Sequence, residues 1–567
     1  MRGRLTLCLC VLVWMKADLA VAQEITATLR GTVVDASKGV VRDAKVTATN
    51  TLTGIGRFTK TDQNGAYVLP LLSAGPYELV VEATGFERFV RKGITLSVNQ
   101  QAVVDVELSV GSLSEVVQVV GEAPAVNIVQ GATGQVIGST ATHQLPLNGR
   151  NYLQLAMLQS GIAPRSFAVI EFTPTLPGQQ IFSANGLRPQ SNSFLLDGAD
   201  NNDGVLGTAA AVPSPDALEE FRILTNAYSA EYGRAGGAVI NVLTRSGSND
   251  LHGSVFDFLR NQTFDARDFF SSNVPPLTQN QFGGTLGGPL RRNRTFFFVS
   301  YEGFRNKQGV TASATVLTMA ERQGDFSRSS LKPRDPTTGQ LFPNHQIPAF
   351  RISPIAQRIL GLVPAPNAGG NRLISTVNGD TNSDQFLLRG DHQVSKRNTL
   401  FARYFYQGGT IAKPFTAPPP VNIPGFPYQD EFGIQNAVIT DTHTFQPNLI
   451  HVARFTYSRM RTVNNHPAYR FDPVTLGFRY PGVGNIPTIL LSGLTTMGTS
   501  SSTDNLRRDN TFQFQEKITY LRGPHTIRFG SDAYRNRFSL RGDTSVNGSF
   551  SFSGGFTGSP AADFLLG

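Results

Sequence analysis

The sequence is poor in charged residues, cysteine and tryptophan, and these shortages exclude several classes of protein. Only 16% of its 567 residues are charged, against roughly 25% in ordinary soluble domains. Cys8, Cys10 and the single Trp14 all lie in the first 22 residues. Without that segment the chain has no thiol for a disulfide, a zinc–thiolate site or an iron–sulfur cluster. After the N-terminus, no apolar run reaches the roughly 18 residues that a membrane-spanning helix needs.

The first 22 residues have the pattern of a secretory signal peptide. Arg2 and Arg4 precede an apolar stretch from Leu5 to Met15, and Ala20-Val21-Ala22 is a typical cleavage site. The alternative, a membrane anchor, is disfavoured because a stretch of about 11 residues is too short to cross a bilayer. We therefore predict an exported chain that begins at Gln23.

Residue types that carry catalysis or bind cofactors lack the required spacing. The eight His are scattered, and no nucleophile elbow, phosphate-binding loop or dinucleotide fingerprint is present. The net charge of +9 is spread along the chain, whereas nucleic-acid binding needs clustered basic residues. Asp197, Asp200 and Asp203 could bind Ca²⁺, but Asp and Asn at this spacing are commoner in turns. We predict a protein that is not an enzyme, with no metal, no other cofactor and no nucleic-acid partner.

Residues 23–110 alternate as short strands separated by turns rich in Gly, Asn and Asp, which predicts a small β-sandwich. About seven short strands are expected, and the clearest candidates are Leu29–Asp35, Ala44–Asn50, Gly65–Leu69, Tyr77–Thr84 and Val103–Leu108. The segments Thr61–Tyr67, Gly75–Tyr77 and Gly85–Phe86 resemble the carboxypeptidase regulatory-like domain. That resemblance implies a transthyretin-like sandwich that permits sugar binding without demonstrating it.

Residues 111–248 contain an ordered series of short motifs. They are Leu113–Gly121, Gln144–Tyr152, Phe182–Arg188, Phe194–Asn201, Ala217–Arg222 and Glu231–Val242. This series resembles the plug domain of TonB-dependent outer-membrane receptors of the Oar-like branch. The alternative is a freestanding α+β periplasmic domain. The plug-motif residues identified by the resemblance are Asn148, Gly149, Arg150, Asn185, Gly186, Arg188, Asp197, Gly198, Glu231, Tyr232, Gly233 and Arg234.

One β-branched segment between these two regions is a candidate for energy coupling. It consists of Glu115, Val116, Val117, Gln118 and Val119, and it resembles the TonB box, which in this family pairs with the TonB protein as an added strand. Such a segment suits β-augmentation, where main-chain hydrogen bonds supply the affinity. An ordinary strand that ends the sandwich or begins the plug fits the sequence equally well.

Residues 249–567 alternate between apolar and polar side chains over segments of 9–13 residues. In Thr511–Leu521 one face carries Phe512, Phe514, Ile518 and Tyr520 with Glu516, and the other carries Gln513, Gln515, Lys517 and Thr519. This pattern is typical of a transmembrane β-strand with a lipid face and a lumen face.

Short and long connections alternate in the same region. Short turns are expected at 291–294, 395–398, 446–448 and 522–524, and long polar loops at 305–383, 408–431 and 460–509. Outer-membrane barrels sort their connections in this way, with short periplasmic turns and long extracellular loops.

The combined expectation is a mainly β chain with an N-terminal transthyretin-like β-sandwich, an α+β plug domain and a partial antiparallel transmembrane β-barrel. The expected boundaries are a signal peptide at 1–22, the sandwich at 23–110, the plug at 111–248 and the barrel from 249 to 567. Because only about ten strands can be counted, whereas a plugged lumen takes about 22, we expect the chain to lack part of the barrel.

The resemblance implies a TonB-dependent receptor in the outer membrane of a Gram-negative bacterium, in contact with outer-membrane lipid. It would take up a scarce or large extracellular ligand, with an oligosaccharide as one candidate. The alternative is a surface carbohydrate-binding or adhesion protein that performs no transport.

Overall fold

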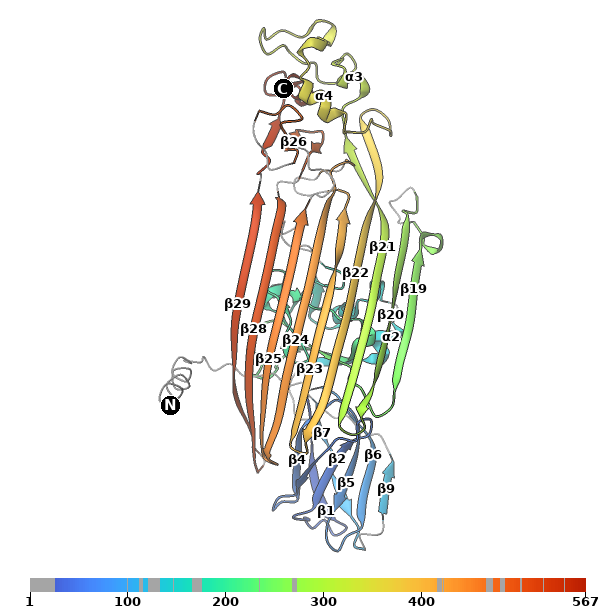
Figure 1. Cartoon of the computed structure of the whole chain (residues 1–567), viewed down its shortest axis with the longest axis vertical. Coiled ribbons are helices and arrows are strands. Elements are labelled where there is room, and N and C mark those ends of the chain that lie inside the picture. Colours follow the sequence, from blue (N-terminus) through green and yellow to red (C-terminus); the bar gives the residue numbers. More distant parts are fainter. Residues whose placement is uncertain are drawn as a thin grey trace, which may run out of the picture.

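The computed structural model has three β-rich parts: the first lies at one end of the long axis, and the second lies behind the third in the view of Figure 1. The structure describes residues 26–98, 100–111, 116–120, 133–145, 147–165, 176–233, 235–267, 273–415, 421, 423–465, 473–479, 485–499, 502–523, 525–544 and 546–567. The predicted signal peptide lies outside these residues.

The first part is a two-sheet sandwich, as predicted. One sheet contains β1 (Ala27–Asp35), β4 (Ala66–Leu72), β7 (Gln101–Val103) and β8 (Val106–Leu108). The other has the order β3 (Gly56–Lys60), β2 (Lys45–Asn50), β5 (Gly75–Glu82), β6 (Arg88–Leu96) and β9 (Val116–Val120). Inward-facing residues such as Leu29, Val46 and Leu79 form the core between the sheets. The strands β3 and β6 are not among the candidates named from the sequence, because their charged residues interrupt the apolar alternation.

The second part, the plug, is built around one mixed sheet. Its strand order is β10 (Thr133–Gly138), β17 (Leu218–Asn226), β18 (Val239–Thr244), β13 (Ser193–Leu196) and β14 (Ala199–Asp200). Two small hairpins, β11 (Ile162–Pro164) with β12 (Phe182–Ala184) and β15 (Asn202–Asp203) with β16 (Thr208–Ala209), accompany it. The helical turns are α2 (Ser139–Gln144), η1 (Asn148–Arg150), η2 (Tyr152–Leu158), η3 (Pro189–Ser191) and η4 (Pro215–Ala217). Buried aromatic residues such as Phe182 and Phe194, whose ring centroids are 5.7 Å apart, fill its core.

The third part is a nine-stranded antiparallel sheet, here called the wall. Its strands, in spatial and sequence order, are β19 (His252–Asn261), β20 (Leu277–Arg291), β21 (Thr295–Thr315), β22 (Arg372–Ser395), β23 (Asn398–Lys413), β24 (Tyr428–Gln446), β25 (Leu449–Asn465), β28 (Ser502–Arg522) and β29 (His525–Thr544). The wall does not close into a barrel within the described residues, since β19 and β29 each pair with a single strand. The plug packs against one face of the wall, and their apolar residues form a shared core that includes Phe298 and Phe405.

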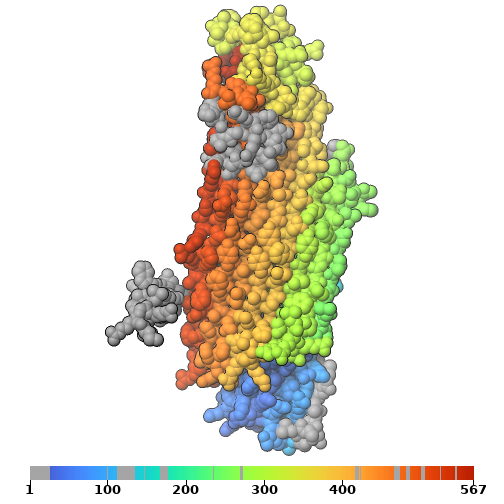
Figure 2. Space-filling view, viewed as in Figure 1, coloured from blue at the N-terminus to red at the C-terminus, as the bar shows by residue number. Residues whose placement is uncertain are grey.

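The predicted alternation in the wall is confirmed, with its polar side buried. In β28 the side chains of Gln513 and Lys517 are 1% and 2% exposed, whereas Phe514 is 41% exposed. In the neighbouring strand β29, Phe529 is 53% exposed. The polar face therefore points to the plug and the apolar face points outward, which is the arrangement of a membrane barrel rather than of a soluble sheet. Figure 2 shows the wall from the side that faces away from the plug. No helix among the described residues has the length and hydropathy needed to cross a membrane.

The four predicted short turns are confirmed at the wall end that faces the sandwich (Figure 1). Except for β19, the strands are, however, longer than the 9–13 residues expected, with 15 to 24 residues each. β21 continues to Thr315 and β22 begins at Arg372, so the connection between them is shorter than predicted. The strand lengths were underestimated because the strand ends outside the membrane pair through backbone hydrogen bonds, which do not require apolar alternation.

At the opposite end, the long connections fold together into a compact cap. It contains α3 (Met319–Arg322), η6 (Pro343–His345), η7 (Ala349–Arg351), α4 (Pro354–Leu360), β26 (Thr488–Leu491), β27 (Thr496–Met497), β30 (Ser549–Phe552) and α5 (Pro560–Leu566). A separate apolar core, with Phe326, Ile359, Ile489 and Phe564, unites these segments. One further turn, η5 (Gln262–Phe264), follows β19. The long connections are therefore packed structure rather than only exposed surface segments.

Candidate functional site at the plug and wall

Three of the predicted plug motifs form turns with two consecutive residues in the left-handed region. The φ angles are 62° and 53° at Gly149-Arg150, 52° and 75° at Asn185-Gly186, and 53° and 73° at Asp197-Gly198. The last pair joins β13 to β14 in a two-residue hairpin, where two positive φ angles match the twist of the strands. Gly198 is suited to this position because it has no Cβ. The turn leaves the Asp197 carboxylate directed at the wall.

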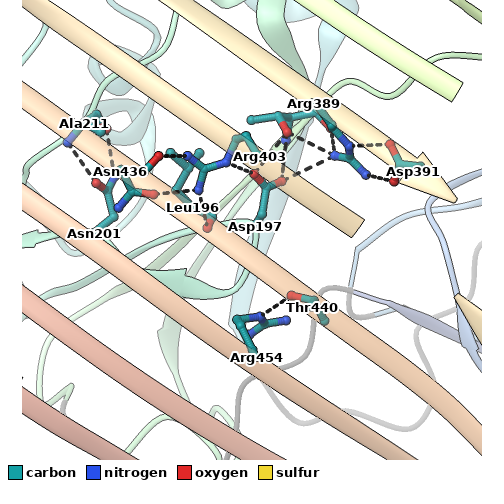
Figure 3. Close-up of polar contacts among 11 residues, drawn as sticks. Leu196, Asp197, Asn201, Ala211, Arg389, Asp391, Arg403, Asn436, Thr440 and Arg454 are labelled. Atoms are coloured by element: carbon teal, nitrogen blue, oxygen red, sulfur yellow. Dashed lines mark hydrogen bonds and ion pairs between the residues drawn. The ribbon is translucent and has the colours of Figure 1, made fainter. Parts of the chain in front are cut away.

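Asp197 is the centre of a buried polar cluster between plug and wall (Figure 3). Its Oδ2 accepts a 2.7 Å hydrogen bond from Nε of Arg403, and both side chains are fully buried. Arg389 approaches Oδ1 to 3.6 Å, and the backbone N–H of Thr244 donates to the same atom at 2.9 Å. Arg403 also donates to Oδ1 of Asn436 at 2.7 Å. Burying charges in this way is tolerable only when every group is paired, so the cluster fixes the plug to β22, β23 and β24.

Two further plug carboxylates bind basic residues of β28 and β29. Asp203 accepts a 2.7 Å hydrogen bond from Nη2 of Arg507. Glu231 accepts a 3.0 Å hydrogen bond from Nη1 of Arg528, and Nζ of Lys517 lies 3.6 Å from its other oxygen. Because Asp203 and Glu231 are buried, these pairs replace contacts with water by contacts with the wall, on strands other than those that hold Asp197.

Arg150 forms a contact of opposite polarity, with the cation on the plug. Its guanidinium donates to Oε2 of Glu302 in β21 at 3.1 Å, and it also pairs with Asp216 of the plug. The guanidinium carbon lies 4.3 Å and 4.5 Å from the ring centroids of Phe256 and Phe258 in β19. Ion pairing and cation–π stacking together select arginine over lysine at this position.

The remaining predicted motif residues have other roles. Asn185, Gly186 and Arg188 are exposed, and the Asn185 amide donates to the Thr225 carbonyl at 2.7 Å. Tyr232 is buried in a small apolar cluster beside Val239. Asn148 is described only in its backbone within η1, Gly233 is exposed, and Arg234 lies outside the described residues.

The three aspartates considered for Ca²⁺ have other partners. Asp197 and Asp203 are paired with arginines, and Asp200 accepts a hydrogen bond from Asn202. Their residues form tight turns and a hairpin, as the turn interpretation predicted.

The wall residues that hold the plug were not predicted from the sequence. They are Glu302, Arg389, Arg403, Arg454, Arg507, Lys517 and Arg528. Each lies on the polar face of its strand. The sequence alone identifies it only as a charged residue that faces the lumen and does not indicate its partner on the plug. The available signal was an excess of basic residues on that face.

A cavity of about 300 Å³ lies between the plug and β20–β23, beside Arg150. The Nε2 atoms of Gln281 and Gln385 donate to Oε1 of Glu302 at 2.9 and 3.0 Å. The Oε1 atoms of Gln281 and Gln407 are buried and have no hydrogen-bond partner among the described residues. The cavity therefore offers two acceptors to a ligand or to water.

The predicted TonB-box segment lies partly in the described structure. Glu115 is outside the described residues, and the remaining four residues, Val116, Val117, Gln118 and Val119, belong to β9. β9 runs parallel to β6 at one edge of the sandwich. This is the arrangement of the alternative interpretation, a strand that ends the sandwich.

Comparisons with known proteins agree with this architecture. Residues 243–567 match the family described as "Outer membrane beta barrel domain", and residues 28–109 match the "Carboxypeptidase regulatory-like domain". The TonB-dependent transporter Oar of Myxococcus xanthus is 33% identical over 290 residues, which are 49% of this chain and 26% of Oar. The probable TonB-dependent siderophore receptor PirA of Acinetobacter baumannii is 25% identical over 163 residues, 26% of this chain and 20% of PirA.

Among solved structures, the outer membrane transporter YddB of Escherichia coli is similar, with a TM-score of 0.46 and 11% identity over 71% of this chain and 48% of YddB. The chain thus matches about a quarter of the length of Oar and a fifth of that of PirA.

The match to the outer-membrane β-barrel domain family covers more than half of the 567 residues, and the chain therefore belongs to this family. This result confirms the predicted location in the outer membrane of a Gram-negative bacterium. It also confirms the resemblance on which the sequence analysis relied. The expectation of a non-enzymatic protein agrees with the names of these relatives, which are a transporter and a probable receptor.

Proposed function

We propose that this protein works as a TonB-dependent transporter of the outer membrane, in which the plug blocks the passage along the wall. The observation that carries the proposal is the way the plug is held. Asp197, Asp203 and Glu231 on the plug pair with cations on the wall, and Arg150 pairs with Glu302. Such pairs give a precise resting position and can separate and re-form without any change in covalent structure.

The energy-coupling partner in this proposal is TonB, acting at β9. This strand ends the sheet order of the sandwich, and no described strand pairs with its second edge. An unpaired strand edge is the structure to which an extended segment adds by main-chain hydrogen bonding. TonB would therefore extend the sandwich sheet beside Val116–Val120.

Deletion of residues 113–120 tests this assignment. We expect the deletion to abolish TonB-dependent uptake while the protein still inserts into the outer membrane, as measured by heat-modifiable migration on a gel. Uptake that persists in the inserted deletion variant would contradict the assignment of the TonB box.

An oligosaccharide is the ligand class that we propose, and it would enter from the end that carries the cap. The cavity beside Arg150 is lined by the amide side chains of Gln281, Gln385 and Gln407 with Ser383, and two buried amide oxygens there lack partners. Sugar hydroxyl groups are suitable donors to such acceptors. Titration of the detergent-solubilised protein with maltotriose should give measurable binding that Gln407→Leu weakens at least tenfold.

Equal binding of maltotriose by the wild-type chain and the Gln407→Leu variant, or no binding at all, would reject this ligand class. A surface carbohydrate-binding protein without transport would bind sugar equally well. Uptake of labelled maltotriose by cells with and without TonB distinguishes it from a transporter, because only transport requires TonB.

A further inference from the structure

The sandwich contacts the wall and its junction with the plug. The backbone N–H of Asn249, which lies just before β19, donates to the carbonyl of Leu52 at 2.8 Å. Nη1 of Arg57 donates to Oγ1 of Thr444 near the end of β24 at 2.9 Å. The β2–β3 hairpin of the sandwich is therefore fixed at two separate points at the short-turn end of the wall.

The sandwich also contacts the plug at Ser97 and Val98, and Val98 makes two of these hydrogen bonds with its main chain. Its backbone N–H donates to Oε1 of Glu220, and its carbonyl accepts a 2.9 Å hydrogen bond from Nη1 of Arg222. Val98 is 1% exposed, Glu220 7% and Arg222 4%. Both main-chain groups of Val98 are thus held by buried side chains, one acidic and one basic, an arrangement that we call the Val98 clamp.

The two sides of the Val98 clamp belong to central elements of their domains. Glu220 and Arg222 are two residues apart on β17, so their side chains share one face of that strand. β17 lies between β10 and β18 in the plug sheet. On the sandwich side, Val98 follows β6, the strand that pairs with β9. The clamp therefore joins the core strand of the plug to the strand beside the predicted TonB box.

The sandwich also bounds a second cavity, of about 560 Å³. Asn50 and Tyr77 of the sandwich line one side, Glu219 and Thr244 of the plug another, and Arg389 with other wall residues the third. A molecule that travelled along the inner face of the wall toward the short-turn end would reach this cavity and meet the sandwich.

We infer that the sandwich is a latch that ties the plug to the wall, and that the plug cannot be displaced until the Val98 clamp opens. This inference rests on the proposed function only in assuming that the plug is displaced during transport. The latch assigns a mechanical role to a domain whose family resemblance implied sugar binding.

Hydrogen exchange on the full chain without its signal peptide tests the latch. The clamp is broken with the double variant Glu220→Ala/Arg222→Ala. The matched control is Lys45→Ala/Glu82→Ala, which removes a 3.2 Å ion pair from the sandwich surface. Like the clamp variant, it removes one acidic and one basic side chain and leaves the net charge unchanged. We expect the Val98 amide and the amides of β17 to exchange at least tenfold faster in the clamp variant and to be unchanged in the control. Equal exchange rates in both variants would overturn the latch.

A reversible tether keeps the inference testable if the clamp variant fails to fold. The chain after residue 22 has no cysteine, so Leu52→Cys with Asn249→Cys introduces the only possible disulfide. With Glu220 and Arg222 intact, the oxidised tether should slow β17 exchange at least threefold relative to the reduced form. No difference between the oxidised and reduced forms would count against a latch.

TonB binding is measured separately, so that the two proposals can fail independently. The periplasmic domain of TonB is titrated onto the wild-type, clamp and tethered chains. Absence of binding to all three would reject the proposed function, while the exchange rates would still decide the latch. Binding accompanied by faster β17 exchange in the reduced but not the oxidised tethered chain would support both.

Discussion

The plug has two interfaces that are built differently. Toward the wall, charged side chains of the plug meet charged side chains of β21–β29 at several separate places. Toward the sandwich, Glu220 and Arg222 hold the main chain of Val98, and Ser97 also hydrogen-bonds to Glu220. Among the described residues, the ion pairs to the wall are spread over several strands, whereas these contacts to the sandwich gather on two side chains of one strand. Loss of one ion pair should therefore weaken the first interface only in part, and loss of Glu220 and Arg222 together should weaken the second much more.

The largest effect is expected from Asp197→Ala. The substitution leaves Arg403 fully buried without its partner, and breaking a buried pair in this way costs about 3–5 kcal/mol. Hydrogen exchange of the β13 and β18 amides should show that the equilibrium constant for plug opening rises at least a hundredfold. A change of less than tenfold would show that the wall interface does not depend on this cluster.

A smaller effect is expected from Arg150→Lys, which keeps the charge but loses the planar group that stacks on Phe256 and Phe258. Loss of one charged hydrogen bond and of the stacking should cost about 2 kcal/mol. The thermal unfolding midpoint of the plug, followed by circular dichroism, should fall in Arg150→Lys and fall further in Arg150→Ala. Identical midpoints for wild type and Arg150→Lys would mean that only the charge matters.

The sandwich interface should depend on pH, with Glu220 as the responsible group. Burial raises the pKa of Glu220 from 4.5 to about 7, and hydrogen bonds from Val98 and Ser97 only partly oppose this shift. The docked state therefore binds the proton more tightly, so docking is strongest below pH 4.5 and weakens as the pH rises through 7. Between pH 5 and pH 8, exchange at Val98, corrected for its intrinsic pH dependence, should accelerate at least tenfold. The same slope in Glu220→Gln would exclude this group as the cause.

The smallest effect is expected from Arg188→Ala. This plug-motif residue is exposed, and a surface substitution of this kind should change stability by less than about 0.5 kcal/mol. The thermal midpoint of the plug should match that of the wild type. A loss comparable to that of Arg150→Lys would indicate that motif membership, rather than contact with the wall, determines stability.

Part of this architecture could be predicted because it is encoded locally. The Asp197-Gly198 and Asn185-Gly186 turns are visible in the sequence, since few residue pairs accept two positive φ angles. The alternation in β28 identified its two faces correctly. Both features depend only on residues that are close together in the chain.

The features that could not be predicted depend on residues far apart in the chain. Arg403 and Asp197 are 206 positions apart, and no local pattern relates them. The cap was missed because its apolar residues, such as Phe326 and Phe564, come from connections that meet only in three dimensions. The Val98 clamp was missed for a related reason, since a main-chain contact leaves no residue signature at Val98.

A double-mutant cycle on Asp197 and Arg403 tests most directly the central claim that ion pairs hold the plug against the wall. The free energy of plug opening is measured by hydrogen exchange for the wild type, Asp197→Asn, Arg403→Gln and the double variant. Because the two side chains are in direct contact at 2.7 Å, we predict a coupling free energy of at least about 1 kcal/mol. Additive effects, within about 0.5 kcal/mol, would contradict the claim.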